Sequence, residues 1–160
     1  MTSPSAGPTG PAGAAVIDGL QRVLGAQHAA VFGYPALGVH LDDQAEQNQA
    51  AGAEANHRAT RDTLAAQLVA LGASPVASQP QYSPPTELTS VAAARRWAVA
   101  LEEESAAAYR YLLVCAAPAG SAELAIRKQA VTGLTAAASA ALYWRRLVSP
   151  DRPTVPFPGT

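Results

Sequence analysis

The sequence predicts an all-α protein, a bundle of four long helices with a long crossover between the second helix and the third. Alanine, the strongest helix former, supplies 38 of the 160 residues, whereas Phe, Trp and Tyr together supply only 9. Apolar residues recur at steps of three and four along four separate segments. Pro, Gly and Ser cluster between these segments, where turns and loops are expected.

The four periodic segments have recognisable ends. Each is about 25 residues long and would span about 38 Å at a rise of about 1.5 Å per residue. Asp43 is a good N-cap for the second segment and Thr89 or Ser90 for the third, while Gly72 and Pro150 follow the ends of the second and fourth. The segments cover residues 14–37, 43–71, 89–116 and 121–147. The pattern of the fourth favours a buried face made of Leu124, Val131, Leu134, Ala138 and either Ala141 or Leu142.

The lengths of the connections predict the topology. The first and second segments, and the third and fourth, are joined by short turns and should form antiparallel pairs. The stretch Ala73–Leu88 has 16 residues and could reach about 53 Å when extended at about 3.3 Å per residue. Such a connection can run the length of the bundle, so the second and third helices should be parallel, as in ferritin-like bundles.

The remaining composition bounds the domain layout and excludes some classes of partner. We expect a disordered lead over residues 1–13, the helical domain over 14–148 and a Pro-rich tail over 149–160. The net charge of −1, with scattered basic residues, offers no surface for nucleic acid, and no apolar run is long enough to cross a membrane. The single Cys115 in an apolar run suits a free thiol and a cytoplasmic protein.

Several polar residues fall on or beside the inward faces of the helices, where a metal could bind. Glu54 and His57 form a Glu-x-x-His pair, which places a carboxylate and an imidazole on one helical face. In the third helix Glu102 and Glu104 flank the apolar stripe on opposite sides, and either could turn inward. The candidate metal ligands are therefore Glu54, His57, Glu102 and Glu104, with iron or another divalent metal as the cofactor.

A second interpretation of the same region needs no metal. Arg61 lies on the face of helix two that carries Glu54 and His57, and a guanidinium can balance buried carboxylates as a metal would. Under this interpretation the bundle has no cofactor, the metal ligands are vestigial, and a buried polar layer is formed by Gln27, Glu54, His57, Arg61, Glu102 and Tyr109.

Four stretches of the chain resemble a known family. They are LGAQHAAVFGY over residues 24–34, EANHRATRD over 54–62, LEEESAAAYRYL over 101–112, and the late pair Trp144-Arg145. Together they are similar to the actinobacterial ferritin-like domain family of unknown function, and the resemblance covers about residues 16–147. It implies a ferritin-like four-helix bundle without supplying an activity.

A ferritin-like di-iron centre takes a Glu from each of two helices and a Glu-x-x-His from each of the other two. The first helix offers the amide of Gln27 where a carboxylate would be needed. Between Glu123 and Asp151 the fourth helix has no Asp, Glu or His. The usual ligand set is therefore incomplete, and the sequence favours a degenerate site without metal.

Three functions remain open at this point. The favoured one is a non-catalytic structural or interaction protein, with a homodimer or an unknown protein as partner, because Tyr111, Tyr143 and Trp144 are larger than an Ala-rich interior needs. The alternative is a metal-binding oxidase or storage protein that uses Glu54, His57 and a Glu of the third helix. The last is a carrier of a small apolar ligand held between Ala-lined helices.

Overall fold

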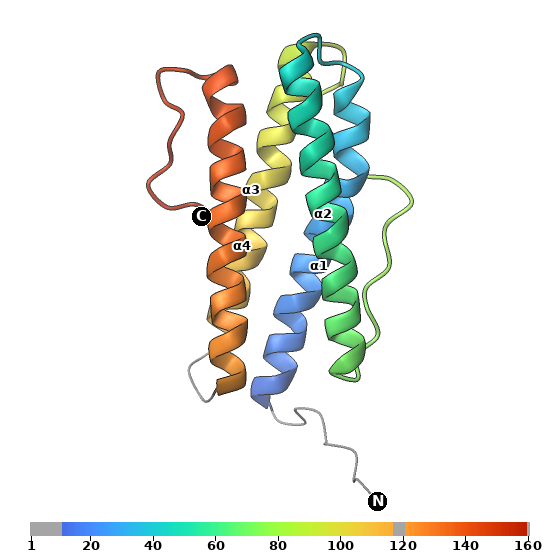
Figure 1. Cartoon of the computed structure of the whole chain (residues 1–160), viewed down its shortest axis with the longest axis vertical. Coiled ribbons are helices and arrows are strands. Elements are labelled where there is room, and N and C mark those ends of the chain that lie inside the picture. Colours follow the sequence, from blue (N-terminus) through green and yellow to red (C-terminus); the bar gives the residue numbers. More distant parts are fainter. Residues whose placement is uncertain (1–10, 117–120, 160) are drawn as a thin grey trace, which may run out of the picture.

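A computed structural model describes residues 11–116 and 121–159 of the chain. The described residues form helices and no strand, so the predicted all-α class is confirmed. None of these helices combines the length and apolar character that a membrane span needs. The helices are α1 (Pro11–Gly38), α2 (Gln44–Ala70), α3 (Val91–Cys115) and α4 (Ser121–Val148) (Figure 1).

The helix ends follow the predicted caps. The side chain of Asp43 accepts a hydrogen bond from the backbone N–H of Glu46 at the start of α2, and Ser90 caps α3 in the same way. Gly72 has φ +78° directly after the end of α2, a left-handed conformation that favours glycine. The first helix continues through Pro35 to Gly38.

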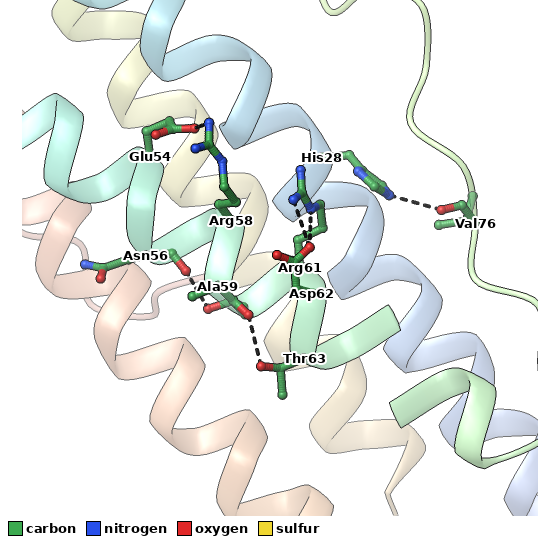
Figure 2. Close-up of polar contacts among 10 residues, drawn as sticks. His28, Glu54, Asn56, Arg58, Ala59, Arg61, Asp62, Thr63 and Val76 are labelled. Atoms are coloured by element: carbon green, nitrogen blue, oxygen red, sulfur yellow. Dashed lines mark hydrogen bonds and ion pairs between the residues drawn. The ribbon is translucent and has the colours of Figure 1, made fainter. Parts of the chain in front are cut away.

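The topology is the predicted one, with a long crossover. In Figure 1, α1 and α4 run in one direction while α2 and α3 run in the other. The segment 73–88, which connects α2 to α3, runs along the outside of the bundle. Gln21 of α1 holds this crossover through two hydrogen bonds, both 2.7 Å long. Its Nε2 donates to Ser74 O, and its Oε1 accepts from Val76 N. His28 donates from Nε2 to Val76 O at 3.0 Å (Figure 2).

The helices do not all pack against one another. Helix α1 packs on α2 and α3, and α4 packs on α3, whereas close backbone packing between α2 and α4 is absent from the described part of the chain. The core is divided into two clusters. One is rich in aromatic residues, including Tyr34, Trp97 and Trp144, and the other is rich in leucine, including Leu24 and Leu112. Polar side chains lie between the two clusters.

The predicted inner face of α4 is wrong at Leu124 and Val131, although Ala141 is buried as predicted and Leu134 packs partly buried against the leucine-rich cluster. Leu124 is 67% exposed and Val131 is 51% exposed, whereas the buried residues of this helix are Ala130, Ala137, Ala141 and Trp144. The helix is thus turned by about one residue, or about 100°, from the expected orientation. This orientation buries the large indole of Trp144, which removes more apolar surface from water than Leu124 or Val131 would.

The ends of the chain differ slightly from expectation. Helix α1 begins at Pro11, three residues before the expected start of the domain, and residues 1–10 of the expected lead lie outside the described residues. Most of the short turn expected between the third and fourth helices also lies outside them, at residues 117–120. The tail over 149–159 forms no helix, and the guanidinium of Arg110 donates to Gly159 O at 3.0 Å.

Candidate functional site

A central polar layer, formed by Gln27 of α1, His57 of α2 and Glu102 and Ser105 of α3, separates the two apolar clusters. His57 lies between two acceptors, with Nδ1 at 2.7 Å from Gln27 Oε1 and Nε2 at 3.1 Å from Glu102 Oε1. Glu102 is only 2% exposed. Three helices therefore converge on one imidazole, which sits against a buried carboxylate.

Two further aromatic residues extend this network towards the aromatic cluster. The hydroxyl of Tyr34 donates to Glu102 Oε1 at 2.5 Å, and Trp144 Nε1 donates to the Tyr34 oxygen at 3.1 Å. The rings of Tyr34 and His57 stack with their centroids 5.6 Å apart. Burial, and then the charge of Glu102, raise the pKa of Tyr34 well above its ordinary value. Tyr34 therefore stays a donor to the carboxylate.

His57 links three helices through its two ring nitrogens, because Nδ1 lies at hydrogen-bond distance from an oxygen of α1 and Nε2 at hydrogen-bond distance from an oxygen of α3. Glu102 also receives the hydroxyl of Tyr34, so two side chains bond to its buried carboxylate. These bonds offset part of the cost of burying the carboxylate.

Two atoms of the polar layer have no partner. Gln27 Nε2 and Ser105 Oγ are buried and form no hydrogen bond within the described residues. Glu102 takes both of its hydrogen bonds on Oε1, which leaves its Oε2 able to accept another. Buried polar groups are nearly always satisfied, so this concentration of unpaired atoms in one layer marks a candidate site.

The unpaired residues line a cavity of about 140 Å³, which we call the central chamber. It lies between α2 and α4, which do not pack closely against each other. The ring of Tyr109 closes one side, where a Cβ at Gly133 would lie 2.2 Å from a ring carbon. The chamber is lined by Gln27, Gln49, Ala53, Asn56, His57, Glu102, Ser105, Tyr109, Gly133, Ala136, Ala137 and Ala140.

The structure corrects the expected placement of Arg61 and Glu54, which do not join the polar layer. Arg61 pairs with Asp62 on the outside of α2, with Nη2 2.8 Å from Asp62 Oδ1, and Glu54 pairs with Arg58 (Figure 2). The physical reason is that Glu102 already takes hydrogen bonds from Tyr34 and His57, while Arg61 and Glu54 each have an oppositely charged partner on α2 itself. Burying the guanidinium would add a desolvation cost and would give up the pair with Asp62.

The choice between the two carboxylates of α3 is also resolved. Glu102 points into the polar layer, whereas Glu104 is exposed and lines the groove beneath the crossover. Tyr109, which the sequence placed in the polar layer, lines the chamber, and burial followed by the charge of Glu102 raises its pKa to about 12. The residues that sequence reasoning missed are Ser105 and Tyr34. The signal for Tyr34 was its place on α1, seven residues after Gln27 and so on the same face.

The donor set does not fit a di-iron centre. Only His57 and Glu102 of the four candidate ligands come together, because Glu54 pairs with Arg58 and Glu104 is exposed. Over the described ranges, no group of three or more His, Cys, Asp or Glu is arranged to hold a metal ion. Helix α4 lines the chamber with Gly133, Ala136, Ala137 and Ala140, none of which has a side-chain donor atom.

Comparisons with known proteins give a matching family and a similar solved structure. The model of the family described as "Domain of unknown function (DUF4439)" matches residues 19–160. A similar solved structure is the crystal structure of a conserved hypothetical protein, rv2844, from Mycobacterium tuberculosis. It shares 30% identity and a TM-score of 0.75 over 84% of this chain and 98% of that chain. Among curated proteins none matches the sequence.

Proposed function

The chain belongs to the DUF4439 family of domains of unknown function, and we propose that it is a ferritin-like bundle with a degenerate, metal-free centre. It acts as a structural or interaction protein and not as an enzyme. The ferritin-like assignment is supported by the parallel α2 and α3 with their long crossover. It is also supported by the mid-bundle position of His57 and Glu102, where such bundles carry their ligands.

The observation that carries this proposal is the absence of metal-binding side chains among the α4 residues that line the central chamber. A di-iron bundle needs a carboxylate or a Glu-x-x-His from every helix, and here one wall consists of glycine and alanine. On the opposite side, Tyr34, Gln27 and His57 bond to one another or to Glu102 in place of a metal. The polar layer therefore joins α1, α2 and α3 through hydrogen bonds that a metal would have to displace.

The test is the affinity of the purified protein for ferrous iron. We expect anaerobic equilibrium dialysis to leave well below one equivalent of iron bound, because two side chains of the right type are too few ligands. His57→Ala is the matched comparison, since it removes one of these two. Stoichiometric iron that is bound by the native chain and lost in His57→Ala would overturn the proposal and establish the metal-binding oxidase or storage protein.

The proposed partner is a second copy of the chain or an unknown protein, and the proposed compartment is the cytoplasm. The aromatic residues that suggested a homodimer are used within the chain, since Trp144 is buried, Tyr143 packs edge-on against it and Tyr111 donates to Asp18. A homodimer would instead be supported by the exposed Leu124 and Val131 of α4. A monomeric mass, measured by light scattering at high micromolar concentration, would rule out the homodimer. The free thiol of Cys115 supports a cytoplasmic location.

A further inference from the structure

The central chamber has the features of a binding site that lacks its ligand. Gln27 is 2% exposed and Ser105 is fully buried, yet Nε2 of the first and Oγ of the second have no partner among the described residues. Both side chains line the same cavity. Buried donors of this kind are costly to leave unsatisfied, so something in the chamber must accept their hydrogen bonds.

The size of the chamber limits what can fill it. Its volume is about 140 Å³, close to the roughly 150 Å³ of an engineered cavity that binds benzene. A molecule of about six non-hydrogen atoms fits, or a few waters at about 30 Å³ each. A sugar, a nucleotide or a lipid chain could place only one end of itself in the chamber.

The walls of the chamber leave a path for entry. Helices α2 and α4 do not pack closely, and the residues on the solvent side are the exposed Gln49, Asn56 and Ala136. The rim is therefore made of two neutral amides and a small side chain. The titratable groups that line the chamber include Glu102 and His57, and these two already bond to each other.

The unpaired atoms specify the chemistry of the ligand. Gln27 Nε2 and the Ser105 hydroxyl can donate, while Glu102 Oε2 can accept. A carboxylate ligand has no N–H or O–H group to donate to Glu102 Oε2, and a cation would give the amide of Gln27 nothing to donate to. An apolar molecule would leave all three atoms unsatisfied. A neutral molecule that carries a carbonyl oxygen next to an N–H group meets all of them.

We propose that the central chamber binds a small neutral carboxamide or urea-type compound between α2 and α4. The carbonyl oxygen accepts from Gln27 Nε2 and Ser105 Oγ, and the amide N–H donates to Glu102 Oε2. This inference rests on the proposed function in one respect, since the chamber must be free of metal. It goes further in assigning a ligand class to a cavity that ferritin-like bundles fill with ligand side chains.

The test is a titration of the full chain followed by ¹⁵N-edited NMR, with propanamide as the probe and propanoate as its charged analogue of the same shape. We expect propanamide to give saturable shifts confined to residues around the chamber, with the side-chain amide of Gln27 among them. Propanoate should bind at least about tenfold more weakly, because sites built on hydrogen bonds discriminate strongly against a mismatched partner. Equal binding of both probes would contradict the assignment.

Two matched variants locate the binding. Ala140→Leu fills the chamber from α4 and should abolish the shifts, whereas Ala125→Leu adds the same side chain at an exposed position of the same helix and should leave them unchanged. Ser105→Ala removes one donor and should weaken binding about tenfold. Thermal unfolding of each variant verifies that it is folded.

The possible failures are distinguishable from those of the proposed function. If propanamide causes no saturable shift even at high millimolar concentration, the chamber holds only water and the ligand inference is overturned, while the iron dialysis is unaffected. If the shifts survive Ala140→Leu, propanamide binds elsewhere and the inference is also overturned. If one equivalent of iron binds and propanamide does not displace it at any concentration, both proposals are overturned.

Discussion

Small residues line both the α1/α3 interface and the gap between α2 and α4, with opposite results. A Cβ built on Gly19 of α1 would lie 2.7 Å from Leu112 Cδ1, and one on Gly33 would lie 2.6 Å from Leu101 Cδ1. There the glycines admit leucine side chains from α3 and the two helices pack closely. Across the bundle, Ala136 and Ala140 of α4 face a cavity instead.

The difference shows that a small residue closes an interface only when the facing helix offers an apolar side chain to fill the space. Helix α3 presents leucines to α1, and their burial is favourable. Helix α2 presents Gln49, Asn56 and His57 to α4, and these polar groups cannot be buried against alanine without partners. The two helices therefore stay apart, and Tyr109 of α3 reaches Gly133 in the space between them.

The largest expected effect comes from Trp144→Ala, which removes the anchor that compensates for the missing α2/α4 packing. The indole of Trp144 is fully buried and bonds to Tyr34 of α1. Its loss should leave a cavity and lower the free energy of unfolding by about 3 to 5 kcal/mol. Urea unfolding followed by circular dichroism measures this value, and a loss below about 1 kcal/mol would show that α4 is held elsewhere.

A matched pair of leucine substitutions tests the comparison directly. Gly19→Leu meets both the side chain and the Cα of Leu112 and should destabilise the protein by about 2 to 3 kcal/mol. Ala140→Leu extends into the central chamber and should change stability by less than about 1 kcal/mol. Equal costs for the two, measured by the same unfolding experiment, would mean that the α2/α4 gap is as closely packed as α1/α3.

Alkaline pH should weaken the region around Tyr109. The pKa of Tyr109 is raised to about 12 in the folded protein, mainly by burial and then by Glu102. Its contribution is fully present below the unfolded pKa of about 10 and is lost as pH rises towards 12, because the unfolded state loses the phenolic proton first. We expect a loss of about 1 to 2 kcal/mol between pH of about 9 and 12, and a smaller loss in Tyr109→Phe.

The smallest expected change in the free energy of unfolding is for a substitution on the outer face of α2. Arg61 is partly exposed and pairs with the exposed Asp62, so Arg61→Ala should change the free energy of unfolding by less than about 0.5 kcal/mol. His57→Ala is the informative neighbour, because it removes the partner of the buried Glu102 and should cost several times more. If Arg61→Ala instead costs about 3 kcal/mol, its guanidinium enters the polar layer in solution.

Local signals made the fold predictable. Asp43, Ser90 and Gly72 mark helix ends by backbone chemistry that acts within one turn, and the length of the crossover leaves little freedom in topology. Gln27 and His57 were found because polar residues stood on otherwise apolar stripes. These inferences depend on the sequence within a single helix.

The errors all concern how one helix faces another. Alanine is common on several faces of α4, so periodicity could not select the face with Trp144 over the face with Val131. Glu54 and Arg61 lie near His57 on α2, but each pairs with an oppositely charged residue of α2 itself. The central chamber depends on the distance between α2 and α4, which no single segment encodes.

The hydrogen bonds from Gln21 and His28 to the crossover also bear on the order in which the chain can fold during synthesis. Helices α1 and α2 leave the ribosome first, and α1 already carries the groups that bind Ser74 and Val76. The start of the crossover can therefore settle on α1 before α3 has been made. When α3 emerges, it starts from the same end of the bundle at which α2 began, so the crossover held on α1 favours the parallel orientation of α2 and α3.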